Sequence, residues 1–216
     1  MSADAIVCTH RAISHLLSYL RDVKTNDAEF ACYAKRLMNI LAEEALCFLD
    51  HINVDIITPT NIPLKNVERI DVSNVCAVSV LRSGDALLQS FTNLVPTLAV
   101  GKILIQRDES SEEKNAVLFY SKLPAMISKM KIILCDPMLA TGGSSVMAVE
   151  VLLEKGCQAK NIIFANLISC PEGIAKLKSK YEDVTIVTCV IDEGLNEDKY
   201  IVPGLGDFGD RFYHSN

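Results

Sequence analysis

The chain has 216 residues, half of them hydrophobic, and a formal net charge of −6. This length supports one sizeable core, and a charged fraction of 22% argues against disorder. The acidic balance argues against a nucleic-acid-binding protein, which needs a basic surface, and no apolar run reaches the roughly 20 residues of a membrane span.

Two helices are predicted near the N-terminus, within residues 10–50. The longer one has apolar residues at helical spacing, namely Phe30, Ala34, Leu37, Leu41, Ala45 and Phe48. A shorter helix is expected over residues 10–21. Two prolines then break the pattern in TPTNIPLKN, residues 58–66.

From residue 75 onward, apolar runs alternate with helical patterns. Helices are expected at about 144–155 and 171–180, and strands at 75–81, 99–107, 116–123, 131–135, 161–168 and 184–191. The polar stretch between the second and third strands predicts an exposed hairpin or flap at about 107–118. Apolar strands that alternate with helices indicate an α/β fold with a mainly parallel sheet, covered on both faces. We expect a single domain over 1–216, with its core at 75–191.

The stretch CDPMLATGGSS contains a loop at a strand-to-helix junction, which we call the 136–145 loop. Pro137 biases Asp136 toward an extended backbone, so the Asp136 carboxylate is expected at the carboxyl edge of the sheet, where open α/β folds bind ligands. Gly142 and Gly143 permit a tight turn and bring backbone N–H groups close to an anion. A phosphate would then lie at the start of the next helix.

The 136–145 loop also carries more hydroxyl groups than a helix cap requires. Ser144 or Ser145 is expected to cap the helix, and Thr141 adds a third hydroxyl. A phosphate with a polyhydroxy sugar beside it would use all of these groups together with Asp136. An ordinary strand–turn–helix junction is the alternative. The spacing of a Walker A loop is absent, which disfavours a nucleoside triphosphatase.

Residues 192–216, which we call the 192–216 segment, are rich in glycine and aspartate and follow neither period. They form either a disordered end or part of a site. Gly204, Gly206 and Gly209 match G-x-G-x-x-G, but the sequence leaves no room for the helix and the acid that a dinucleotide fold requires after it. These glycines are therefore expected to serve another purpose.

The eight cysteines include no C-x-x-C pair, and the sequence shows no signal peptide. We expect them to be reduced and mostly buried in a cytoplasmic protein. The four histidines lie far from any cysteine pair, which disfavours a zinc site.

Several of these stretches resemble one family. CDPMLATGGSS, together with YIVPGLGDFGDR at residues 200–211, is similar to motifs of the uracil phosphoribosyltransferases, a branch of the type I phosphoribosyltransferases. LRSGDALL, IQRDE and PEGI are similar to this family's LRAG motif, its arginine before the flap and its PEGI segment. The resemblance covers roughly residues 75–213. It implies the type I fold, with a small hood and a β-hairpin flap.

The resemblance implies transfer of the phosphoribosyl group of phosphoribosyl diphosphate (PRPP) to uracil, which gives UMP and pyrophosphate in pyrimidine salvage. Asp136 would accept hydrogen bonds from the ribose hydroxyls, and Arg82 and Arg107 would hold the pyrophosphate. Mg²⁺ would arrive with PRPP. The implied PRPP-binding residues are Arg82, Arg107, Asp136, Pro137, Met138, Leu139, Ala140, Thr141, Gly142, Gly143, Ser144 and Asp207.

The resemblance assigns the uracil ring to the 192–216 segment. Backbone groups near Ile201, Gly206, Asp207 and Phe208 would read the base. Asp207 would also lie near the reacting carbon, so that the implied catalytic residues are Asp136, Asp207 and Arg107. Phe208 stands where many bacterial members have alanine, and its side chain either narrows the base pocket or packs on its outer wall.

Other interpretations stay open at this point. Arg82 and Arg107 could be surface residues, and Asp207 could be a turn former. The protein could be a sister transferase for another base, or a regulator that binds UMP or PRPP without turnover. We expect a homodimer or homotetramer, with the long N-terminal helix as the contact face. Activation by GTP, which occurs in some family members, is possible here too. Neither nucleic acid nor membrane is expected as a partner.

Overall fold

The computed structural model of the chain describes residues 5–107 and 116–215. Its largest sheet is parallel except at one edge, where β6 runs antiparallel to β5. In spatial order the sheet consists of β1 (Ile6–Val7), β10 (Thr185–Ile191), β9 (Ile162–Ser169), β7 (Lys131–Cys135), β4 (Val75–Leu81), β5 (Ala99–Arg107) and β6 (Ala116–Lys122), with the short β8 (Met138–Leu139) beside β9. The predicted α/β fold with a mainly parallel sheet is confirmed.

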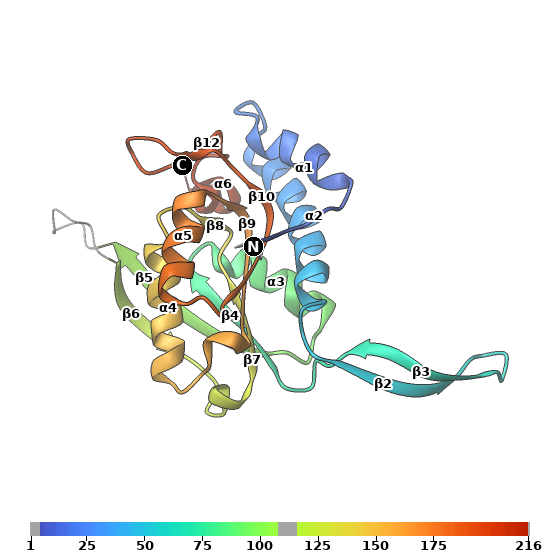
Figure 1. Ribbon diagram of the computed structural model, residues 1–216. Coiled ribbons are helices and arrows are strands. Elements are labelled where there is room, and N and C mark those ends of the chain that lie inside the picture. The colour runs from blue at the N-terminus through green and yellow to red at the C-terminus, as the bar shows by residue number, and fades with distance from the viewer. Residues whose placement is uncertain (1–4, 108–115, 216) are drawn as a thin grey trace.

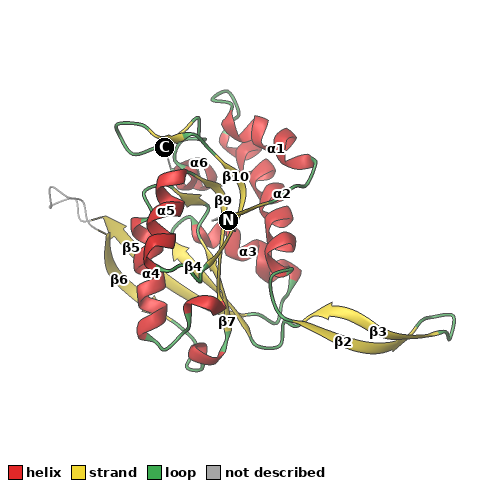
Figure 2. Ribbon diagram, viewed as in Figure 1, coloured by secondary structure: helices red, strands yellow, loops and turns green. Residues whose placement is uncertain are grey.

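Helices cover both faces of this sheet (Figures 1 and 2). One face carries α4 (Gly143–Glu154) and α5 (Pro171–Lys180), and the other carries α1 (Ala12–Arg21), α2 (Asp27–Leu46), α3 (Gly84–Leu94) and α6 (Phe208–Tyr213). Side chains alternate between the faces along a strand, so Ala77 packs toward α2 and α3 while Cys76 and Val78 pack toward α4. A strand buried on both faces must be apolar throughout, which explains the run VCAVSVL.

The two N-terminal helices form where the periodicity predicts them. The side chain of Asn26 caps α2 by accepting the backbone N–H of Glu29 at 3.0 Å. Leu37 and Leu41 are fully buried, because α1, α3 and α6 cover the apolar face of α2. That face is therefore not free for a partner, and our sequence-based reason for oligomerisation is wrong. Phe48 lies beyond the end of α2 and is 40% exposed.

The sequence reading missed a β-hairpin that projects from the body of the molecule (Figure 1). β2 (His51–Ile57) and β3 (Pro63–Ile70) pair antiparallel in this hairpin, which we call the arm. Its prolines mark the turn and the first residue of β3, where a proline costs no ladder hydrogen bond. The exposed apolar side chains of the arm are Ile52, Ile57, Ile62 and Leu64.

The predicted flap corresponds to the hairpin of β5 and β6. These strands pair up to Arg107 and Ala116. The flap residues 108–115 and the side chain of Arg107 lie outside the described part of the structure.

None of the described helices combines the length and the apolar character needed to cross a bilayer.

All eight cysteines are free, and six of them are buried; Cys32 and Cys47 are exposed. The expectation of mostly buried cysteines is confirmed.

Candidate active site

The order of the strands creates a switch point between β4 and β7. The chain leaves β4 for α3 on one face of the sheet and leaves β7 for α4 on the other. Two connections therefore diverge at neighbouring carboxyl ends, which is where α/β folds of this kind bind ligands. Ser83 follows β4 and Asp136 follows β7, so the two residues lie on either side of this switch point.

The 136–145 loop starts at the end of β7 and leads into α4. The N-cap of α4 is Gly142, whose φ of 74° lies in the left-handed region that glycine tolerates. No side chain caps the helix, so the expectation that Ser144 or Ser145 would do so is wrong. The glycine turn instead leaves the first N–H groups of α4 without a side-chain cap, as an anion site requires.

Asp136 lies at the base of the loop, packed among protein atoms but partly exposed to solvent. Burial raises the pKa of its carboxyl to about 7, and the backbone N–H of Met138, at a long 3.5 Å, lowers it only in part. The neighbouring Cys135 is fully buried, and desolvation raises the pKa of its thiol well above the usual range. Cys135 is thus a packing residue, whereas Asp136 is a carboxyl group held ready for a polar ligand.

The PEGI segment supports the loop from behind. Gly173, at the start of α5, lies so close to the loop that a Cβ there would be 2.5 Å from the carbonyl oxygen of Ala140 and 2.6 Å from that of Leu139. The same helix end faces Gly142, since a Cβ on Gly142 would be 3.1 Å from the carbonyl oxygen of Gly173. Glycine is therefore needed at 173 for α5 to pack against the loop.

A cleft of about 620 Å³ opens between the 136–145 loop and the 192–216 segment. Its lining residues are Ser83, Asp136, Met138, Ala140, Ser144, Asp198, Lys199, Tyr200, Ile201, Gly206, Asp207 and Phe208. The cleft is large enough for a nucleotide-sized ligand. The structure thus brings the two stretches that carry the family resemblance to opposite walls of one cavity, although they lie about 60 residues apart in sequence.

The described part of the 192–216 segment, residues 192–215, is folded and contributes to this cleft. It contains β11 (Gly194–Leu195), β12 (Ile201–Val202) and α6, and Gly206 has a φ of 81°. The carboxylate of Asp207 caps α6 by accepting the N–H of Asp210 at 2.9 Å. Asp207 is therefore both a helix cap and a cleft residue.

Phe208 borders the cleft but packs its ring into the core. The side chain is 2% exposed, and its ring centroid lies 5.6 Å from that of Phe30 and 5.4 Å from that of Phe212. Of the two alternatives, packing on the outer wall is the one observed. The bulky residue consequently leaves the cleft free and anchors the segment from behind.

Arg82 does not line the cleft. Its guanidinium forms an ion pair with Asp210 and donates a hydrogen bond of 3.0 Å to the hydroxyl of Ser215. The hydrogen bond from Arg82 holds the pKa of the Asp210 carboxyl below its usual range, with a further contribution from Ser215. The side chain of Arg82 is 54% exposed, so this pairing is open to exchange with a ligand.

Five other predicted PRPP-binding residues belong to the 136–145 loop but do not line the cleft. They are Pro137, Leu139, Thr141, Gly142 and Gly143.

The sequence reading missed four residues that line the cleft, namely Ser83, Asp198, Lys199 and Tyr200. Asp198 and Lys199 directly precede the YIVPG motif, Tyr200 is its first residue, and Ser83 lies within LRSGD. Their proximity to recognised motifs is the one signal that could have identified them.

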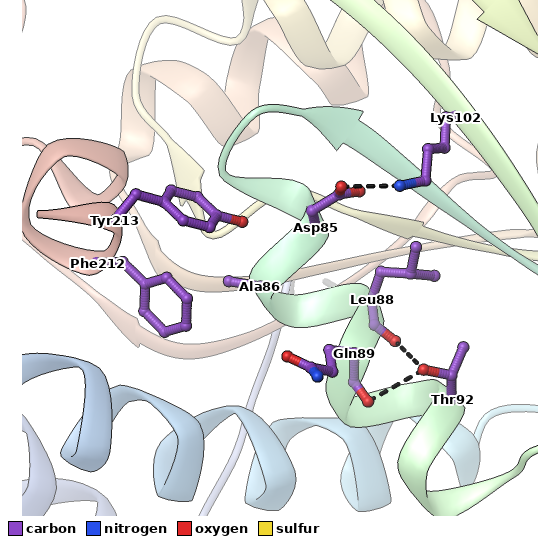
Figure 3. Close-up of a pocket in the computed structure, with 8 residues that line it drawn as sticks. All are labelled: Asp85, Ala86, Leu88, Gln89, Thr92, Lys102, Phe212 and Tyr213. Atoms are coloured by element: carbon purple, nitrogen blue, oxygen red, sulfur yellow. Dashed lines mark hydrogen bonds and ion pairs between the residues drawn. The ribbon is translucent and has the colours of Figure 1, made fainter. Parts of the chain in front are cut away.

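A second pocket, of about 320 Å³, lies beside α3 and α6 and is lined by none of the predicted site residues (Figure 3). In this pocket Lys102 forms a 2.8 Å ion pair with Asp85, and the hydroxyl of Thr92 donates to backbone carbonyls of its own helix. Among the described residues, one oxygen of Asp85 in this pocket stays without a hydrogen-bond partner. The cleft at the switch point is larger and is lined by the predicted site residues, so it is the better candidate for the active site.

Comparisons with known proteins point to one family. The family model described as uracil phosphoribosyltransferase matches residues 7–215. Uracil phosphoribosyltransferase 1 of Schizosaccharomyces pombe is 42% identical over 198 residues, which cover 92% of this chain and 89% of the relative. The uracil phosphoribosyltransferase of Saccharomyces cerevisiae is 43% identical over 199 residues, covering 92% and 90%. A solved protein structure from Aquifex aeolicus has a TM-score of 0.85, 29% identity, and coverage of 98% of this chain and 99% of that one.

A parallel sheet flanked by helices, with the Asp136 loop at its carboxyl edge, defines the fold class as that of the type I phosphoribosyltransferases. The match extends over nearly the whole chain and includes both walls of the cleft. This chain belongs to the uracil phosphoribosyltransferase family.

Proposed function

We propose that this protein transfers the phosphoribosyl group of PRPP to uracil, giving UMP and pyrophosphate. One observation carries the proposal: a single cleft has the 136–145 loop on one wall and the 192–216 segment on the other. In the reaction, the bond from ribose C1′ to the diphosphate breaks as the bond to a uracil ring nitrogen forms, and that nitrogen loses its proton. Both substrates must therefore be held with these atoms in contact.

The loop is the proposed PRPP site. Asp136, in its ionised form, accepts hydrogen bonds from the ribose hydroxyls, and the backbone N–H groups from Ala140 to Ser144 hold the 5′-phosphate. Arg82 exchanges Asp210 for the diphosphate, which offers more oxygens to its forked donors. Arg107 is the second proposed diphosphate ligand. These fixed charges stabilise the charge that develops as the diphosphate leaves.

The opposite wall is the proposed uracil site. Backbone groups of Ile201, Gly206 and Phe208 approach the edge of the ring, and Asp207 lies between the base and the reacting carbon. Gly206 lines the cleft with a positive φ and, as a glycine, places no side chain between its backbone and the ligand. Base recognition by backbone fits the packing of Phe208, whose ring contributes to the core and not to specificity.

Mg²⁺ is proposed to enter with PRPP, held by substrate oxygens and water. Within residues 5–107 and 116–215, no cluster of three or more His, Cys, Asp or Glu side chains could hold a metal ion. Such a cage is not required, because Mg²⁺ usually takes one or two carboxylates alongside substrate phosphates. Asp198 and Asp207 line the cleft and are oxygen donors of this kind. Bound Mg²⁺ would supply positive charge to the diphosphate.

The assembly is proposed to be a homodimer or homotetramer formed through the arm. A two-stranded ribbon by itself is marginally stable in water, and this one exposes isoleucine and leucine side chains. A second copy of the chain is the proposed partner of these side chains.

We also propose a cytoplasmic location, since eight free cysteines suit a reducing compartment. We further propose that GTP activates the enzyme.

Conversion of radiolabelled uracil to UMP with PRPP and Mg²⁺ tests the proposed reaction. Cytosine, orotate and hypoxanthine serve as competing bases in parallel assays. We expect product from uracil alone. Product from another base, or binding of PRPP and UMP without any turnover, would overturn the proposal.

A further inference from the structure

The wall proposed to bind uracil has little sheet structure of its own. β11 and β12 pair over two residues each, and a turn with two positive-φ glycines, Gly204 and Gly206, follows. A segment of this kind is flexible unless other groups fix its backbone. Two arginines from distant parts of the chain contact it, and their hydrogen bonds show how it is held.

The first of these is Arg21, the last residue of α1. Its two terminal nitrogens donate to the two carboxylate oxygens of Asp192 at 2.8 and 2.6 Å, which makes a forked ion pair. The side chain of Asp192 is 4% exposed and that of Arg21 is 25% exposed. Asp192 directly follows β10, so this pair ties the N-terminal helix to the start of the 192–216 segment.

The same pair holds the backbone of Gly204 from both sides. The N–H of Gly204 donates to Asp192 Oδ2 at 2.9 Å, and Arg21 Nη1 donates to the carbonyl oxygen of Gly204 at 2.8 Å. Only glycine suits this position, because its φ is 59° and a Cβ there would collide with the carbonyl oxygen of Ile201. The turn that carries Gly206 is thus fixed two residues before the cleft.

Arg211, on α6, holds the next residue. Its guanidinium donates to the carbonyl oxygen of Leu205 at 2.9 Å and to the backbone carbonyls of Leu20, in the last turn of α1, and Asp22, which follows α1. It also lies 4.2 Å above the ring of Phe30, on α2. The backbone immediately before Gly206 is therefore anchored to the N-terminal helices by charge-assisted hydrogen bonds.

We propose that Arg21, Asp192 and Arg211 form a brace that positions the uracil-binding wall of the cleft; this inference rests on the proposed function. None of these three described side chains lines the cleft, so they act through Gly204 and Leu205 and not on the substrates directly. Within the described part of the chain, none of the hydrogen bonds made by Arg21, Asp192 and Arg211 involves a residue of the 136–145 loop. Loosening the brace therefore weakens uracil binding selectively.

The test is steady-state kinetics with Arg21→Lys and Arg211→Lys, which keep the charge but lose the forked donor. A displacement of the base-reading backbone by about 1 Å costs up to about 100-fold in rate, so we expect the KM for uracil to rise about tenfold or more. The KM for PRPP should change less than about twofold, since the phosphate loop keeps its support. A purely structural role would instead lower the amount of active protein without separating the two KM values.

Lys180→Ala is the matched control, because it removes a cation from an exposed 3.0 Å ion pair with Glu150, away from the cleft. It should leave both KM values unchanged. If the wild type is active and both Arg21→Lys and Arg211→Lys keep its KM for uracil, the proposed brace is overturned and the proposed function stands. Loss of cooperative unfolding in both variants would overturn the brace as well. A wild type that forms no UMP would overturn the proposed function and the brace with it.

Discussion

Replacing Asp136 by asparagine should stabilise the ligand-free protein while lowering its use of PRPP. Burial raises the pKa of this carboxyl from 3.8 to about 7. In the unfolded chain the carboxyl ionises at its ordinary pKa. Between these two pH values the folded state binds more protons than the unfolded state, so the contribution of Asp136 to stability falls as the pH rises. Asparagine carries no charge and escapes this cost.

The size of the effect follows from the two pKa values. Each tenfold change in proton affinity is worth about 1.4 kcal/mol, so ionised Asp136 costs the folded protein about 4 kcal/mol above pH 7. At about pH 5 the cost is roughly 1.7 kcal/mol on the same scale. The stability advantage of Asp136→Asn should therefore grow by about 2.5 kcal/mol between pH 5 and pH 8. Water that reaches the carboxylate reduces these values, which makes them upper bounds.

Urea unfolding of both proteins at about pH 5 and about pH 8 measures this difference. The kcat/KM for PRPP of the same variant should fall at both pH values, because a neutral amide is a weaker acceptor for the ribose hydroxyls. Asp198→Asn removes an exposed carboxylate from the same cleft and should change stability by less than about 0.5 kcal/mol. A stability advantage of Asp136→Asn that is equal at both pH values would refute the assignment of a raised pKa.

Three further predictions concern packing and assembly. Gly173→Ala should lower the free energy of unfolding by about 1–3 kcal/mol and raise the KM for PRPP, because the new methyl group pushes α5 away from the 136–145 loop. Gly101→Ala is the control: its methyl group collides with a side chain away from this loop, so it should lower stability without changing the KM for PRPP. Phe208→Ala should cost about 3–5 kcal/mol in urea unfolding, against less than about 0.5 kcal/mol for the 60% exposed Phe119→Ala. Ile57→Asp, in the arm, should produce monomers in sedimentation at micromolar concentration.

Each of these predictions has a contrary outcome. An unchanged KM for PRPP in Gly173→Ala would mean that α5 does not set the shape of the loop. Equal losses of stability for the two phenylalanine variants would contradict the buried position of Phe208. A wild type that sediments as a monomer would remove the arm as an interface between copies, and so would an Ile57→Asp variant that remains oligomeric.

Much of the core follows from local sequence. The apolar run of β4 can be buried only between two layers of helices, and the helical spacing around Leu37 leaves few alternatives to α2. The turn of the 136–145 loop could also be predicted, because the backbone preferences of Pro137, Gly142 and Gly143 do not depend on the rest of the chain. Its helix cap was misread, because α4 begins at Gly143, which puts Ser144 and Ser145 inside its first turn, while Gly142 with its positive φ takes the N-cap position.

The sequence by itself determined the layers of the fold and the turn of the 136–145 loop, because apolar periodicity and backbone restrictions act over a few residues. The tertiary structure alone decided which segments meet. The tertiary structure packs the ring of Phe208 in the core and pairs Arg82 with Asp210. It also joins Arg21 to Asp192, which lies 171 positions further along the chain. Such contacts depend on the arrangement of whole elements, and no local pattern records the partner of a charged side chain.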